Sequence, residues 1–122
     1  MPSEKQIQET FDRVAQDIPG FIAASLVDLE SGMTLGARSL RADFDLTAAS
    51  AYNSEMVKQK LKIMKALKLE TTLEDILLTL GDQIHVIRLV SPTSFIYLAA
   101  DRAQSNIAIV RNAVNKHSSA FT

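Results

Sequence analysis

Residues 73–100 read LEDILLTL, GD, QIHVIRLV, SPTS and FIYLAA, and this stretch decides the fold class. Three apolar runs are separated by two short turn sequences, which predicts three antiparallel strands in a meander. The middle run is apolar on both faces, with Ile84 and Val86 alternating with Ile87 and Leu89. A strand of this kind needs cover on both sides. We therefore expect helices on both faces of the sheet.

The segment before the meander supplies one of those helices. Residues 45–69 are rich in Ala, Leu, Lys, Met and Glu and contain no Gly or Pro, which predicts a helix of about six turns. Its apolar side chains cover an arc of roughly 180°, wider than packing on a sheet requires, so we expect the helix to meet a second partner. That arc consists of Ala49, Tyr52, Met56, Val57, Leu61, Ile63, Met64 and Leu67.

The remaining elements complete the order helix, strand, strand, helix, strand, strand, strand, helix. A capping box of Ser3 and Gln6 begins a helix over 4–17, and strands follow at 21–27 and 33–38. Asp101 is expected to cap a final helix that ends near residue 115, followed by a flexible tail at 116–122. The prediction is a three-layer α/β/α domain of the α+β type, with five antiparallel strands.

Composition limits the possible functions. The 122 residues are 47% hydrophobic, which suits a single domain over 1–122 with a core at about 5–115. The net charge of −1 favours neither nucleic acid nor an anionic membrane. No cysteine, export signal or membrane span is present, so we expect a cytoplasmic protein.

No residue pattern indicates catalysis. His85 and His117 stand apart from any metal-binding or nucleophile motif, and we interpret both as structural or solvated. Asp43 and Asp45 precede the long helix, where capping is their simplest role. We therefore predict no enzyme activity, no cofactor and no metal.

The long helix carries the strongest local charge, with lysines at 58, 60, 62, 65 and 68. This cluster is either a solvated helix face or a docking surface for an acidic protein or an anionic headgroup layer. Aromatic residues do not alternate with the lysines, which argues against single-stranded nucleic acid. The residues that we assign to partner binding are Glu55, Lys58, Lys62 and Lys65.

The strand predicted at 73–80 opens the meander and has little charge to protect it as an edge. Either another part of the monomer covers this edge, or it pairs with a second copy across a two-fold axis. We favour self-pairing, because one dimer would explain both the edge and the wide helix arc. The expected dimer interface consists of Met56, Ile63, Leu67, Leu73, Ile76, Leu77, Leu78 and Thr79.

Several strings resemble the roadblock family, the dynein light-chain type whose bacterial members are small standalone proteins. The opening hairpin is similar at 19–32 (PGFIAASLVDLESG), the third strand at 73–79 (LEDILLT), and the last strand and helix at 98–101 (LAAD) and 106–111 (NIAIVR). The resemblance covers about residues 5–115. This sequence departs from the family pattern in its lysine-rich helix and in the basic loop of Arg38 and Arg41.

The resemblance implies a profilin-like fold and a homodimer built on the third strand and the long helix. Such dimers hold motor subunits, scaffold membrane-associated complexes or regulate small Ras-like GTPases; in the gliding-motility branch the dimer accelerates the GTPase without inserting an arginine. Our hypothesis is a non-catalytic homodimeric regulator or scaffold whose partner is a Ras-like GTPase. The alternatives are a PAS-like small-molecule sensor, which would need a roomy internal pocket, and a motor-type adaptor without a GTPase.

Overall fold

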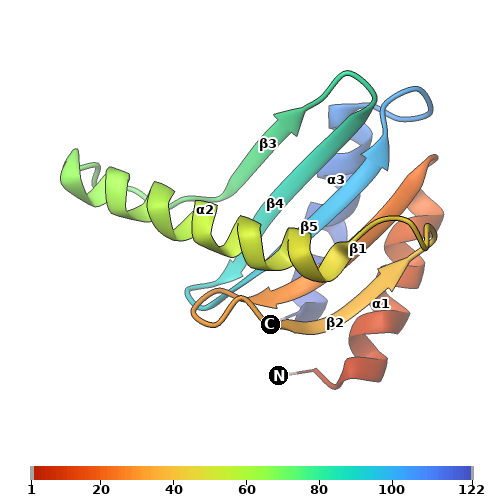
Figure 1. The fold of residues 1–122 in the computed structure, drawn as a ribbon, viewed down its shortest axis with the longest axis horizontal. Coiled ribbons are helices and arrows are strands. Elements are labelled where there is room, and N and C mark those ends of the chain that lie inside the picture. The colour runs from red at the N-terminus through yellow and green to blue at the C-terminus, as the bar shows by residue number, and fades with distance from the viewer. Residues whose placement is uncertain (1, 122) are drawn as a thin grey trace.

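Five strands form one antiparallel sheet in the order β2-β1-β5-β4-β3 (Figure 1). The computed structural model describes residues 2–121. The strands are β1 (Phe21–Asp28), β2 (Thr34–Ser39), β3 (Asp75–Thr79), β4 (Gln83–Ser91) and β5 (Ser94–Asp101). The helices are α1 (Glu4–Asp17), α2 (Leu46–Ala66), α3 (Ile107–His117) and the short 3-10 helix η1 (Ser118–Phe121). The predicted class, sheet and element order are confirmed.

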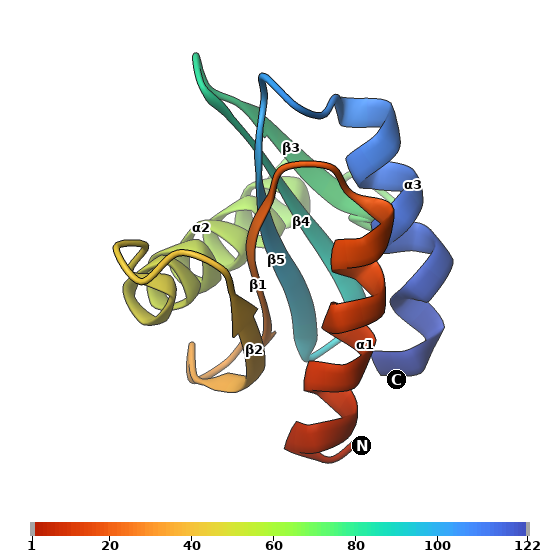
Figure 2. The same ribbon diagram turned by 90° about the vertical axis from the view of Figure 1, so that its right-hand side faces the viewer.

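Helices cover both faces of this sheet, as the apolar strands require. Figure 2 shows α1 and α3 side by side on one face and α2 on the other. Beneath α1 and α3 the core includes Phe11, Leu26 and Leu98, whereas Val57 of α2 packs with Tyr97 on the opposite face. The central strands β1 and β5 are buried along almost their whole length. The terminal helices and the long helix therefore take the positions that the sequence predicts.

Helix α1 lies very close to strand β2, and a glycine makes this approach possible. A Cβ atom at Gly36 would lie 2.6 Å from Cγ2 of Ile7 and 2.8 Å from its Cβ. Such distances are well inside van der Waals contact, so any larger residue at this position would displace α1. The predicted capping box begins the same helix, since Gln6 N–H donates to Ser3 Oγ and Ser3 N–H donates to Gln6 Oε1.

Helix α2 begins where the sequence predicts but ends three residues earlier. Asp45 caps its start by accepting a hydrogen bond from Ala48 N–H. At the other end Lys68 adopts a left-handed conformation with φ of 56°, Lys68 N–H donates to Lys65 O, and Leu69 N–H donates to Met64 O. These bonds form a Schellman ending, in which the left-handed position normally carries glycine. The predicted extension to residue 69 is therefore wrong.

The other boundary errors concern β3 and the C-terminal region. Strand β3 spans Asp75–Thr79, shorter than the predicted 73–80. Asn106, not Asp101, caps α3 by accepting a hydrogen bond from Ile109 N–H. Residues 102–104 instead form a turn in which Asp101 accepts a hydrogen bond from Ala103 N–H.

The predicted flexible tail is also corrected for residues 116–121. Helix α3 continues to His117, and η1 follows it directly. Phe121 is only 2% exposed, and its ring centroid lies 4.8 Å from that of Phe11 in α1. Burial of this aromatic ring against the core holds the segment in place. Residue 122 lies outside the described residues.

Candidate protein-interaction surface

Helix α2 is attached to the sheet mainly through its first half. Ser50 Oγ lies 2.8 Å from Ser25 Oγ of β1, and Ser54 Oγ donates to the carbonyl of Leu29 at 2.6 Å. Both serines are buried, together with Val57 one turn further on. Small hydroxyl side chains let the helix approach the strand while their polar atoms stay bonded.

The two flanks of α2 differ in chemistry. Successive side chains of a helix are rotated by about 100° around its axis. With Val57 facing the sheet, this rotation directs two sets of side chains to opposite sides of α2. We call the first set the apolar flank; its members are between 39% and 77% exposed. The apolar flank consists of Tyr52, Met56, Ile63 and Leu67. The second set, the charged flank, consists of Glu55, Lys58, Lys62 and Lys65.

The wide apolar arc of the sequence is thus divided between two surfaces. Ala49, Val57 and Leu61 pack on the sheet, whereas the apolar flank has no cover within residues 2–121. Exposed apolar side chains that lie together on one helix commonly mark a site of protein association. The apolar flank contains three of the predicted interface residues.

The charged flank contains all four residues predicted to bind a partner. Lys58 Nζ lies 3.0 Å from Glu55 Oε1 and donates to the carbonyl of Glu30 at 3.0 Å, so this lysine is already bonded within the chain. Within residues 2–121, Lys62 and Lys65 have no acidic group within ion-pair distance. These two lysines provide the unpaired positive charge of the flank.

Strand β3 lies at the edge of the sheet, as expected, with β4 on one side only. Leu77 and Leu78 are 38% and 43% exposed. The register with β4 puts Ile76 and Leu78 on the α2 face, opposite Ile87 and His85. By the alternation of strand side chains, Leu77 and Thr79 face the α3 side. Among the predicted interface residues outside α2, Leu73, Ile76 and Leu78 lie on the face that α2 covers.

An ion cluster at the start of β3 went unnoticed in the sequence. Asp75 is largely buried, and its Oδ2 lies 2.7 Å from Arg111 Nε of α3 and 3.8 Å from Arg88 Nη1 of β4. In the sequence, the cluster is indicated only by Asp75, an acidic residue within an otherwise apolar strand. The cluster joins the edge strand to α3, since a buried carboxylate requires such partners.

The two histidines have structural contacts. His85 Nδ1 lies 3.1 Å from the Tyr97 hydroxyl, and Nε2 lies 2.8 Å from Gln83 Oε1. Burial lowers the pKa of His85 and raises the pKa of Tyr97 to about 12. His117 Nε2 lies 2.8 Å from Asp17 Oδ2, and this hydrogen bond lowers the pKa of that carboxyl group. Each histidine therefore connects neighbouring elements of the fold.

The described residues also bear on metal binding and on membrane-spanning helices. The described part of the chain, residues 2–121, holds no cluster of three His, Cys, Asp or Glu side chains suited to a metal ion. Among the helices in the same range, none is long and apolar enough to span a bilayer.

Solved structures share this arrangement of helices and edge strand. MglB from Myxococcus xanthus is 18% identical, with a TM-score of 0.86 over 100% of this chain and 90% of that chain. A Roadblock/LC7 domain from Streptomyces avermitilis is 12% identical, with a TM-score of 0.79 over 91% of this chain and 90% of that one. The protein has the roadblock fold. An MglB with a tetrameric arrangement also shares the roadblock fold, at 14% identity and a TM-score of 0.83 over 98% of this chain and 86% of that chain.

The roadblock resemblance seen in the sequence is thus confirmed at the level of the fold. Searches with models of protein families and among curated proteins find no match. The TM-scores of 0.79–0.86, at identities of 12–18%, show a common fold.

Proposed function

We propose that this protein is a non-catalytic, cytoplasmic homodimer that regulates or scaffolds other proteins, with a small Ras-like GTPase as its partner. The observation that carries the proposal is the exposed apolar flank of α2 on the same face as the exposed Leu78 of β3. A solved MglB with the same fold has a tetrameric arrangement, which supports self-association in this architecture.

The backbone of β3 defines how a second copy would pair. Leu80 N–H donates to Gln83 O, and Leu89 N–H donates to Glu74 O, so even-numbered positions of β3 bond to β4. Backbone groups alternate in direction along a strand, and those of Asp75, Leu77 and Thr79 therefore point to the free edge. An antiparallel partner centred on Leu77 would satisfy all of them, with Asp75 opposite Thr79 of the second copy.

The apolar flank faces the axis of such a dimer. The charged flank lies toward the end of the sheet that carries residues 29–33 and 91–94, where Lys58 reaches the Glu30 carbonyl. The apolar flank is on the opposite side of α2, toward the level of Leu77. A two-fold axis perpendicular to the sheet keeps both long helices on one face, so their apolar flanks would meet.

Pairing of the apolar flanks would leave the two charged flanks exposed for a partner. Lys62 and Lys65 lack acidic partners within residues 2–121, so they suit an acidic surface patch on a GTPase. We propose Glu55, Lys58, Lys62 and Lys65 as the partner-binding residues. Because charges at an interface rim act mainly on encounter, their replacement should slow association and reduce its salt dependence.

Cysteine cross-linking tests the dimer directly, because the chain contains no cysteine. Leu77 would face its copy as a hydrogen-bonded pair with Cβ atoms about 5.5 Å apart, which exceeds the about 3.5–4.5 Å of a disulfide. A short bismaleimide should therefore join Leu77→Cys chains into a covalent dimer. Met33→Cys is a matched control, since Met33 is exposed in the β1–β2 turn. Sedimentation of the unmodified chain as a monomer would refute the dimer, and Leu77→Lys should produce that monomer or an aggregate.

The GTPase part of the proposal needs a separate experiment. Affinity capture from the source cell lysate, followed by GTP hydrolysis assays with any captured Ras-like GTPase, should reveal binding that Lys62→Glu plus Lys65→Glu weakens. A dimer that captures no GTPase and leaves hydrolysis unchanged would favour the adaptor alternative. The PAS-like alternative lacks its expected internal pocket, because packed side chains fill both faces of the sheet in the described chain.

A further inference from the structure

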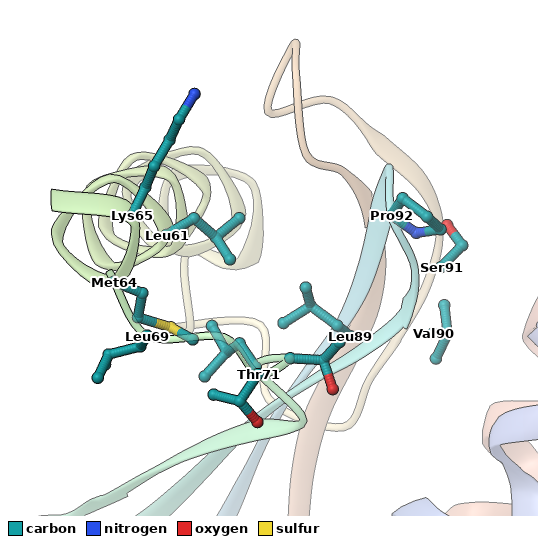
Figure 3. Close-up of a pocket in the computed structure, with 11 residues that line it drawn as sticks. Leu61, Met64, Lys65, Leu69, Thr71, Leu89, Val90, Ser91 and Pro92 are labelled. Carbon is teal, nitrogen blue, oxygen red and sulfur yellow. The ribbon is translucent and has the colours of Figure 1, made fainter. Parts of the chain in front are cut away.

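A surface pocket of about 630 Å³ lies beside the second half of α2 (Figure 3). Its walls come from the end of α2, the connection to β3 and the end of β4. Ligand pockets typically occupy about 300–1,000 Å³, so this one is large enough for a small molecule. The pocket adjoins the core beneath α2, since Leu61, Leu73 and Leu89 belong to both.

Aliphatic side chains form most of the lining. Figure 3 shows Leu61 pointing from α2 toward Leu89, with Met64 and Leu69 on the helix side. Leu73 and Pro92 complete the apolar wall. No aromatic residue lines the pocket, so it offers no ring for stacking or for a cation–π contact. This lining suits a flexible aliphatic chain better than a flat aromatic ligand.

Polar groups occur at a few positions around the apolar part. Thr71, Thr72 and Ser91 contribute hydroxyls, and Lys65 is the one charged residue of the lining. In Figure 3 the Lys65 side chain extends away from Leu89 and Leu69, so its ammonium lies outside the apolar interior. With no acidic partner within residues 2–121, this ammonium is free to pair with a negative group. Charge and apolarity are therefore separated along the pocket.

We propose that this pocket binds a single-chain anionic amphiphile, with its aliphatic chain against Leu61, Leu69 and Leu89 and its carboxylate or phosphate at Lys65. The site goes beyond the proposed function, although its lining shares Lys65 with the proposed partner-binding residues and Leu73 with the predicted dimer interface. Lys65 belongs to the charged flank, on the side of α2 away from the axis through Leu77. The amphiphile could therefore bind this pocket in each chain of the homodimer.

Calorimetric titration of the full chain with laurate, below its micellar concentration, tests the site. We expect saturable binding of one laurate per chain. Lys65→Gln should weaken this binding about fivefold, because a partly exposed charge pair contributes ~1 kcal/mol. Lys62→Gln, on the same flank but outside the lining, should leave the affinity unchanged. Dodecanol, which has the chain without the charge, should bind more weakly than laurate.

A second pair of variants tests the apolar wall. Leu69→Glu should abolish laurate binding, since it places a carboxylate in the lining; Leu40→Glu, similarly exposed and outside the lining, should not. Absence of saturable laurate binding, or equal affinities for the Lys65→Gln and Lys62→Gln variants, would overturn the proposal. The protein could instead co-sediment with phosphatidylglycerol vesicles, equally well with and without Leu69→Glu, and fail to bind laurate. That result would assign the lysines to a lipid surface and overturn the pocket proposal. Sedimentation of each variant separates these outcomes from failure of the dimer.

Discussion

Replacement of Lys68 by glycine should stabilise the protein, although glycine within a helix normally destabilises. Lys68 has φ of 56° at the end of α2, a left-handed conformation that costs an L-residue about 1–2 kcal/mol. Glycine adopts it without strain but gives the unfolded chain more conformational entropy, which costs about 0.4–1 kcal/mol. The net gain in the free energy of unfolding should be about 0.5–1 kcal/mol.

Urea denaturation followed by circular dichroism measures this gain. Protein concentration must be equal in all samples, because self-association adds to apparent stability. In thermal unfolding the same gain should raise Tm by about 2–4 °C for a chain of this size. The matched control is Lys62→Gly, at an exposed position inside α2, which should lower the free energy of unfolding by about 1 kcal/mol.

The two substitutions should therefore have opposite signs. If Lys68→Gly lowers stability as much as Lys62→Gly does, residue 68 belongs to a continuing helix and the Schellman ending is wrong. Lys68→Ala helps to separate the causes, because alanine retains the strain of a left-handed residue and should give no gain.

Two further predictions concern the core and the half-buried His85. Phe121→Ala should lower the free energy of unfolding by about 3 kcal/mol in urea denaturation, because it empties a site packed against Phe11; a loss below about 1 kcal/mol would show that η1 does not stabilise the fold. Because burial lowers the pKa of His85 from its ordinary value of 6.5, the unfolded chain binds the proton first, and stability should fall as the pH drops below that value. His85→Gln should reduce this loss, and an equal loss in the variant would assign the pH dependence to other groups.

The three-strand meander and the two-sided cover were predictable because they follow from long, regular patterns. A middle strand apolar on both faces can be stable only between two helical layers, which places the 45–69 helix opposite the terminal pair. The width of the apolar arc likewise predicted a second surface on α2. The structure confirms the exposure of that surface at Tyr52 and Leu67, and the identity of its partner stays a prediction.

The errors occurred where tertiary contacts decide local structure. Lys68 ends α2 in a conformation that the sequence signals only when glycine is present. Asp101 and Asn106 are both good caps, and only the turn between them selects the second. Phe121 lies in a polar segment without helical periodicity, and its burial depends on the distant Phe11. The Asp75 cluster similarly joins residues from three separate elements.

The pairing of β1 with β5 has a consequence for how the chain folds. Phe21 lies opposite Ala100, so the centre of the sheet joins segments from near the two ends of the sequence. During synthesis, β1 leaves the ribosome long before its neighbour exists, with apolar residues on both faces and one edge unpaired. Such distant pairing makes folding slow. Nearly the whole sequence must be available before the core can close, and until then the first hairpin presents an aggregation-prone apolar surface.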